Sequence, residues 1–194
     1  MINHKSIRYF EKIILIVSKL FKFLDSKDTL RILVYHHIEK KDFKKFYDQL
    51  KILKNKWNFI TPVEFENHIY GKKKLKGKNL LLTFDDGFKS NYTVEKNILR
   101  KLNIKSIFFV PSDFIKIRST KKSKKFINEN ILDNNIDNHE KKLSNMTIQN
   151  LKSLLRSGNL IGCHTKTHAN LGVINEKSKL KNEILQSAKY LESS

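Results

Sequence analysis

One uninterrupted apolar stretch that ends in two adjacent carboxylates constrains the fold more than any other part of the chain. Leu80 to Phe84 reads Leu-Leu-Leu-Thr-Phe, and Asp85, Asp86 and Gly87 follow directly. A continuous apolar run of this length is typical of a strand that is buried on both faces of a parallel sheet. Ligands in such folds gather at the carboxyl ends of the strands. We therefore predict that this strand delivers acidic side chains to a pocket.

The adjacency of Asp85 and Asp86 permits two different roles. Neighbouring residues that leave a strand point in different directions, so one carboxylate can hold a metal ion while the other stays free as a base. Gly87 permits a tight turn with the backbone close to a ligand. A polar turn that caps a helix beginning near Phe88, with an aspartate at the N-cap, explains these residues equally well. The motif alone does not decide between the two interpretations.

A second motif places two imidazoles four residues apart. His164 and His168 have a spacing that lets both side chains reach one ion from a helical turn or a tight loop. Two surface histidines on a solvated helix are the alternative. A short apolar run with a glycine, residues 159–162, precedes them and indicates the end of a strand. Two histidines and one aspartate would make a three-ligand set with room for water, the composition of a catalytic metal site.

The rest of the chain alternates between predicted strands and helices. Strands are predicted at 31–34 and 105–110, and helices at 42–57, 91–102, 147–156 and 177–191. This alternation indicates an α/β fold with a parallel sheet. The segment 116–145 interrupts it, because its composition is poor in apolar residues and rich in Lys, Asn and Asp. We predict that this segment is a mobile polar insertion or lid.

The motifs together resemble those of a known family. Thr83–Gly87 and His164–His168 resemble the first two motifs of the polysaccharide deacetylase family, the NodB-homology carbohydrate esterases. Tyr35–Ile38 and Phe59–Phe65 resemble the N-terminal part of the branch that includes poly-N-acetylglucosamine deacetylases, and the similarity runs from about residue 30 to residue 191. The resemblance implies a partial or distorted (β/α) barrel within the α/β class.

The same resemblance implies a metal site. Asp86, His164 and His168 would bind a divalent ion, with zinc as the default for a mixed nitrogen and oxygen set. Asp85 would accept a proton from the attacking water. The reaction would remove N-acetyl groups from an acetylated amino-sugar polysaccharide or glycan, which would be the partner of the chain. The same groups would also serve an O-acetyl esterase or a cyclic amide hydrolase, and a catalytically weak metal- or glycan-binding fragment is a further alternative.

The acid that protonates the leaving amine is expected to come from the N-terminal strand. His36 and His37 directly follow the predicted strand at 31–34. In the resembling branch a histidine from this strand is thought to reach the active site, and imidazole is the side chain whose pKa lies nearest to working pH. Either histidine fits that role. A core histidine that closes a hydrogen bond is the alternative for each.

The sequence ends at Ser194, shortly after its last predicted helix. Members of the family usually continue into a strand with an Arg/Phe-x-Pro-Tyr type motif that supplies an oxyanion N–H, and then into strands with a further acidic motif. We therefore expect a deacetylase-like domain at 29–194 that is truncated at its C-terminus and exposes a sheet edge. A naturally short protein that binds metal but catalyses poorly is the alternative.

The net charge of the chain and its single cysteine limit the partners that we expect. The chain has 39 Lys and Arg residues against 19 Asp and Glu residues, a formal net charge of +20. The lysines are scattered without an arginine-rich stripe or a nucleic-acid motif, so we expect no specific nucleic-acid partner. The single cysteine, Cys163, excludes an internal disulfide, and we expect it to be a small buried thiol rather than a metal ligand.

Residues 1–28 are predicted to form an amphipathic helix. Apolar residues recur at near-helical spacing between Ile7 and Leu24, but lysines interrupt the run, which is also too short to span a bilayer. No small-residue cleavage site follows it. The helix either packs on the domain or makes a peripheral contact with an anionic membrane, and an uncleaved export signal is a third interpretation. A cytoplasmic or membrane-associated location is favoured, with export as the alternative.

Overall fold

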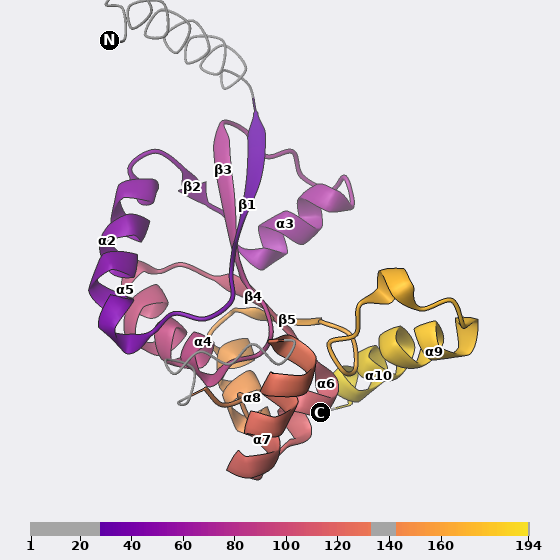
Figure 1. The fold of residues 1–194 in the computed structure, drawn as a ribbon. Coiled ribbons are helices and arrows are strands. Elements are labelled where there is room, and N and C mark those ends of the chain that lie inside the picture. Colours follow the sequence, from indigo (N-terminus) through magenta and orange to yellow (C-terminus); the bar gives the residue numbers. More distant parts are fainter. Residues whose placement is uncertain (1–27, 133–142, 194) are drawn as a thin grey trace, which may run out of the picture.

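The strands form one parallel sheet in the computed structural model, which describes residues 28–132 and 143–193. Its order is β1 (Thr29–Tyr35), β3 (Lys78–Phe84), β4 (Ser106–Val110) and β5 (Leu160–Cys163), and β2 (Asn58–Phe59) also pairs with β3. One edge of β3 is paired along its whole length with β1. Its other edge is shared, because β2 pairs with Asn79 and Leu80 while β4 pairs with Leu82 to Phe84. Within the described residues β1 and β5 are the outermost strands of the sheet, which is therefore an open, partial barrel (Figure 1).

The central strand β3 is buried from Asn79 to Phe84, as the apolar run predicts. Side chains on alternate residues face two different cores, because successive residues of a strand point to opposite faces of the sheet. Leu82 and Phe84 join the larger core, and Leu81 joins a smaller core on the other face. The carboxyl end of β3 is thereby fixed from both sides, and the residues that follow it have a defined direction.

Helices cover the two faces of the sheet unequally (Figure 1). The larger core lies between the sheet and a group of helical segments: α2 (Phe43–Lys54), α4 (Lys89–Val94), η2 (Glu95–Leu99), α5 (Arg100–Leu102) and α8 (Ile148–Arg156). The amphipathic pattern of α2 buries Phe46 and Leu50, and a capping box of Thr147 and Asn150 begins α8. On the opposite face, α3 (Pro62–Ile69) contributes Phe65 to the smaller core.

The face of the sheet on which α3 packs remains partly open. Ile32 and Val34 of β1 are 51% and 45% exposed, although both point to this face. They line a groove of about 360 Å³ together with Leu81, Ile107 and other residues of the same face. The groove reaches Asp85 and His164 at the carboxyl ends of the strands. This groove therefore runs along the apolar face of the sheet to the predicted site.

The predicted polar insertion, residues 116–145, contains helices in the part of it that the structure describes. After α6 (Ser112–Lys116), the chain forms α7 (Thr120–Phe126) and a π-helical segment, η3 (Ile127–Ile131). Ile127 is buried in a third core with Phe88, Phe114 and Leu143. Apolar residues at helical spacing among lysines make this packing possible, and the polar average composition of the segment conceals them. Residues 133–142 lie outside the described residues.

The chain closes its described part with short helical segments around the loop after β5. These are η5 (Leu171–Val173), α9 (Lys177–Lys181), η6 (Asn182–Gln186) and α10 (Ser187–Glu192); near the start of the chain, η1 (Lys40–Asp42) leads into α2. None of the described helices is long and apolar enough to cross a membrane. The predicted N-terminal amphipathic helix, and with it the predicted membrane contact, falls on residues 1–27, outside the described residues.

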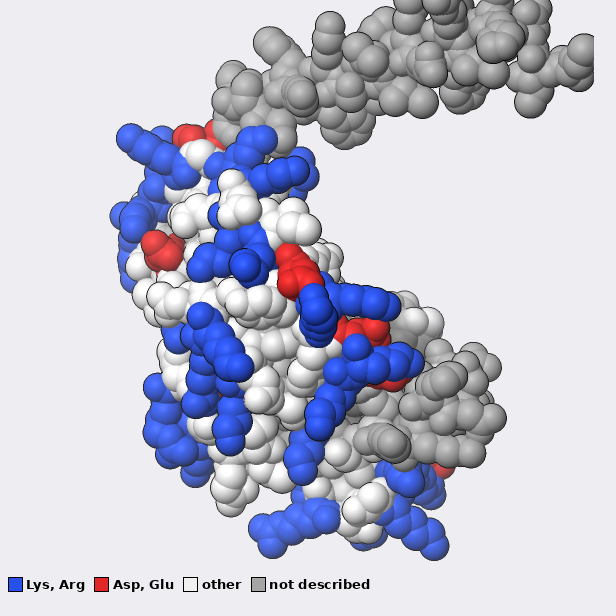
Figure 2. Space-filling model, turned by 90° about the vertical axis from the view of Figure 1, so that its left-hand side faces the viewer, with Lys and Arg blue, Asp and Glu red and all other residues white. Residues whose placement is uncertain are grey.

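Basic side chains are spread over the surface. Figure 2 shows one face on which Lys and Arg side chains are scattered with few acidic side chains between them, and no stripe forms on that face. This distribution agrees with a lysine-biased composition.

Candidate metal centre

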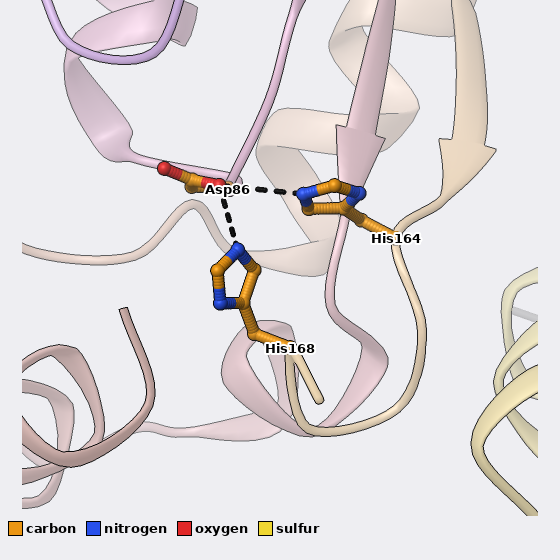
Figure 3. A group of neighbouring side chains, drawn as sticks. All are labelled: Asp86, His164 and His168. Carbon is orange, nitrogen blue, oxygen red and sulfur yellow. Dashed lines mark ion pairs between the residues drawn. The ribbon is translucent and has the colours of Figure 1, made fainter. Parts of the chain in front are cut away.

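Three predicted ligands converge at the carboxyl ends of β3 and β5. Asp86 lies in the turn between β3 and α4, and His164 and His168 lie in the loop after β5 (Figure 3). The Nε2 atoms of His164 and His168 are 3.4 and 3.2 Å from Oδ1 of Asp86. One ligand atom of each side chain lies within 4.8 Å of those of the other two. Side chains far apart in the sequence therefore present their nitrogen and oxygen atoms to one small volume.

A strained turn directs the Asp86 side chain toward the histidines. Asp86 has φ 67° and Gly87 has φ 71°, so two successive residues adopt the left-handed conformation that side chains disfavour. The turn is closed by a hydrogen bond from the Gly87 N–H to the Asp85 carbonyl at 2.9 Å. A Cβ at position 87 would lie 3.1 Å from Ile115, so this glycine is needed for space as well as for φ. The turn sends the neighbouring carboxylates to different places, as the sequence predicts.

The histidine loop is also strained and is held by its surroundings. Thr165 and His168 have φ values of 63° and 65°. The carbonyls of Thr165 and Lys166 accept hydrogen bonds from the N–H groups of Ser112 and Asp113, at 3.2 and 2.9 Å, at the start of α6. Backbone strain of this kind costs on the order of 1–3 kcal/mol per residue and persists only where neighbours enforce it. Backbone of this kind occurs in both segments that carry the candidate ligands.

The Asp86 carboxylate has the electrostatics of a cation ligand. Its side chain is buried, and burial alone would raise its pKa, but the two imidazoles beside it hold the pKa well below its usual range. Asp86 therefore stays ionised. Oδ1 is buried and accepts no hydrogen bond of normal geometry within the described residues, although both imidazole nitrogens are near it. A buried, ionised oxygen without such a bond fits coordination to a cation.

His168 has the second contact that a metal-binding histidine usually has. Its Nδ1 lies 2.6 Å from the carbonyl oxygen of Asn130 in η3. A carbonyl only accepts, so Nδ1 carries the hydrogen, and in the neutral ring Nε2 then presents its lone pair toward Asp86. Two acceptors facing each other at 3.2 Å need a cation between them, or else a charged imidazole. The residues present thus fit a divalent ion. Sequence reasoning missed Asn130, because a carbonyl contact across 38 residues leaves no local signal.

Asp85 lies beside this group but faces the groove. Its side chain is half-buried, and it lines the groove with Thr83 and His164. Burial raises the pKa of Asp85 above its usual range, and the nearby imidazoles of His164 and His36 offset only part of that rise. The buried Asn91 donates a hydrogen bond at 3.0 Å to the Asp85 carbonyl and so helps to fix the turn. The sequence analysis also missed Asn91. A polar residue among the apolar positions of α4 is a signal of a buried hydrogen bond such as this one.

The two histidines after β1 point to different places. His37 Nδ1 lies 2.6 Å from the Ser90 hydroxyl, and its ring packs edge-on against Phe88. His36 is exposed, and its imidazole acts on the pKa of both Asp85 and Asp86 in the lowering direction. His36 therefore lies within electrostatic range of both carboxylates.

Cys163 is not part of the ligand group. It is half-buried, not fully buried as expected, and its Sγ lies 3.9 Å from the Ile184 carbonyl oxygen. It lines the groove beside His164.

A sheet of parallel strands with an Asp-His-His group at their carboxyl ends defines an α/β protein of the NodB type, and comparison with known proteins places the chain in a family. The sequence profile of the polysaccharide deacetylase family matches residues 72–194. The chain belongs to the polysaccharide deacetylase family, as its motifs indicate. The search of curated protein sequences found no match.

Solved structures share the fold at low sequence identity. IcaB from Ammonifex degensii matches with a TM-score of 0.66 and 22% identity over 86% of this chain and 69% of its own. The deacetylase PplD of Streptococcus pyogenes, solved with acetate, matches with a TM-score of 0.63 and 19% identity over 87% and 69%. A de-N-acetylase from Aggregatibacter actinomycetemcomitans matches with a TM-score of 0.56 and 19% identity over 84% and 74%. These matches show that the partial barrel is a NodB-type fold.

Proposed function

We propose that the chain is a metal-dependent N-deacetylase of an acetylated amino-sugar polymer or glycan. The observation that carries the proposal is the convergence of Asp86, His164 and His168 beside a second carboxylate, Asp85, that faces an open groove. Membership of the polysaccharide deacetylase family supports hydrolysis of acetyl groups. The N-acetyl preference is supported by a structural neighbour described as a de-N-acetylase, and the acetate bound to PplD is the product that such a reaction releases.

The proposed roles follow from where the side chains lie. Asp86, His164 and His168 would hold a divalent ion, with zinc as the expected metal. When bound, such an ion polarises a carbonyl group and lowers the pKa of water. Asp85 faces the groove and is a stronger base than an ordinary aspartate, because burial raises its pKa. It would accept a proton from the water whose oxygen attacks the acetyl carbon.

Breaking the amide bond requires a proton for the departing nitrogen. His36 is the candidate acid, because it lies within electrostatic range of both aspartates, whereas His37 is engaged with Ser90. In this scheme the carbon–nitrogen bond breaks, the water oxygen remains on the acetyl carbon as acetate, and the sugar nitrogen leaves as an amine. Asp85 then releases its proton to solvent and His36 takes one up from solvent, so both groups return to their starting states.

The test combines metal content and acetate release on one sample. Purified chain, freed of metal with a chelator, is assayed for acetate release from N-acetylglucosamine oligomers with and without added zinc. We expect about one zinc per chain and acetate release that depends on it. Bound zinc without acetate release from these oligomers would overturn the N-acetyl substrate class, and the same assay on O-acetylated oligomers would then test the ester. A chain that binds no divalent metal would overturn the site itself.

A further inference from the structure

A buried carboxylate outside the ligand group holds the histidine loop. Glu183 lies in η6 and is 8% exposed. Its Oε2 accepts hydrogen bonds from the backbone N–H groups of Lys166 at 3.0 Å and Thr167 at 2.9 Å. Its Oε1 accepts a hydrogen bond from the Thr167 hydroxyl at 3.0 Å. Both partner residues lie between the two histidine ligands, so the Glu183 side chain is hydrogen-bonded to the centre of the loop.

The next turn of the same helical segment makes a second contact with the loop. Ser187, four residues after Glu183, is fully buried, and its hydroxyl donates a hydrogen bond at 2.7 Å to the Thr165 carbonyl. Residues four apart share one face of a helix. One face of the segment 182–192 therefore contacts three successive loop residues, 165 to 167.

The contacts with Glu183 and Ser187 complement those made by α6. At the start of α6, backbone N–H groups satisfy the carbonyls of Thr165 and Lys166. Glu183 satisfies the N–H groups that the loop presents on its other side. Burial of a carboxylate is unfavourable unless hydrogen bonds compensate it, and bonds to a charged acceptor are the strong ones. The Glu183 carboxylate is compensated by the loop conformation that brings both imidazoles to Asp86.

We propose that Glu183, assisted by Ser187, is a positioning residue for the metal centre. It touches none of the three ligand side chains in these contacts, and it acts by holding the strained backbone between them. This inference rests on the proposed metal site. It predicts that the affinity for zinc depends on a helix that contributes no ligand of its own.

The test compares Glu183→Gln with Glu192→Gln, which makes the same change of charge at an exposed position of the same helical segment. Two quantities are measured on the folded, full chain: the affinity for zinc, by competition with a chromophoric chelator, and the hydrogen exchange of the Lys166 and Thr167 amides in the metal-free chain, by NMR. The glutamine side chain keeps the size of glutamate, but it loses the charge and one of the two acceptor oxygens. We expect about tenfold weaker zinc binding in Glu183→Gln, together with faster exchange of both amides. Glu192→Gln should match the parent in both.

Ser187→Ala is the second variant, because it keeps the net charge and tests the same helix face if Glu183→Gln does not fold. Loss of one neutral hydrogen bond should weaken zinc binding about fivefold, and Ser193→Ala is its exposed control. Parental zinc affinity and parental amide exchange in the folded variants would overturn the inference and leave the proposed function intact. If the parent itself binds no zinc, the proposed function fails, and the amide exchange rates still decide whether Glu183 holds the loop.

Discussion

At the scale of single residues, the backbone separates the tasks of two adjacent aspartates. Asp85 continues the alternation of β3 and faces the groove, whereas the left-handed φ of Asp86 turns its carboxylate to the histidines. The two carboxylates have opposite pKa shifts, because burial dominates at Asp85 and the imidazoles dominate at Asp86. These opposite shifts agree with the roles proposed for the two side chains, Asp85 as a base and Asp86 as a cation ligand.

Substitution of Asp85 by asparagine should separate hydrolysis from metal binding. Asparagine keeps the shape of the side chain but cannot accept the proton, so acetate release should fall by roughly 100- to 10,000-fold. Zinc affinity should stay within a few fold of the parent, because Asp85 is not in the ligand group. Acetate assays and zinc titration on the same sample measure both. The control is Asp48→Asn on α2, which should change neither, and an active Asp85→Asn chain would show that another group is the base.

The pair His36 and His37 should respond differently to replacement by alanine. His36→Ala removes the candidate acid, which acts electrostatically on both aspartates, and we expect kcat to fall by about 100-fold. His37→Ala removes the contact with Ser90, and we expect a loss of stability of about 1 kcal/mol with a smaller change in kcat. Steady-state kinetics and urea unfolding distinguish the two outcomes. A larger loss of kcat in His37→Ala would reverse the assignment.

At the scale of elements, one buried amide joins the sheet to the helices behind it. Asn159 precedes β5 and is 2% exposed. Its Oδ1 accepts a hydrogen bond from the Ser106 N–H of β4 at 2.9 Å, and its Nδ2 donates to Glu95 Oε1 in η2 at 3.2 Å. Glu95 in turn pairs with Arg100 at 3.0 Å. This network fixes the start of β5, and therefore the place from which the histidine loop departs.

Asn159→Ala should lower the free energy of unfolding by on the order of 2–4 kcal/mol, because it leaves the buried Ser106 N–H without its partner and removes a donor from Glu95. Urea unfolding followed by circular dichroism measures the change. Asn97→Ala, at an exposed helical position, is the matched control and should stay within about 0.5 kcal/mol of the parent. Equal stabilities of the two variants would show that the network contributes little.

Elements were predictable where their signal is local. The apolar run of β3 and the spacing of Phe46 and Leu50 in α2 are visible in any window of the sequence, and those elements appear where predicted. The helices at 120–131 were not predicted, because lysines dominate the composition and hide a narrow apolar face. The hydrogen bonds of Glu183 join it to Lys166 and Thr167, which lie 17 and 16 residues before it, and such contacts have no pattern of their own in the sequence.

At the scale of the whole molecule, the sheet that the described residues form is open and does not close into a barrel. β1 is an outermost strand and carries exposed apolar side chains above the groove. Apolar edge strands favour association with other chains. The positive net charge opposes such association at low salt, and its repulsion is screened as salt is added.

Ile32→Lys should therefore reduce self-association at high protein concentration and high salt. A lysine on the exposed edge strand removes apolar surface and adds repulsion at the groove. Sedimentation velocity in 0.5 M salt, roughly where the Debye length falls to a few ångströms, measures the effect. Ile52→Lys places the same change on the exposed surface of α2, with 59% exposure, and should leave association unchanged. Equal behaviour of the two variants would mean that the open face does not mediate contacts between chains.

The left-handed backbone at Asp86 and His168 also has a consequence for how this protein tolerates mutation. Aspartate, asparagine and histidine are the side chains that such φ values admit most readily, and glycine suits them best. Glycine has no ligand atom and asparagine has no carboxylate, so few substitutes can satisfy both the backbone and the proposed ligand chemistry at these two positions. In a library of all single substitutions selected for zinc binding, these two positions should accept fewer residues than His164, whose φ is not positive.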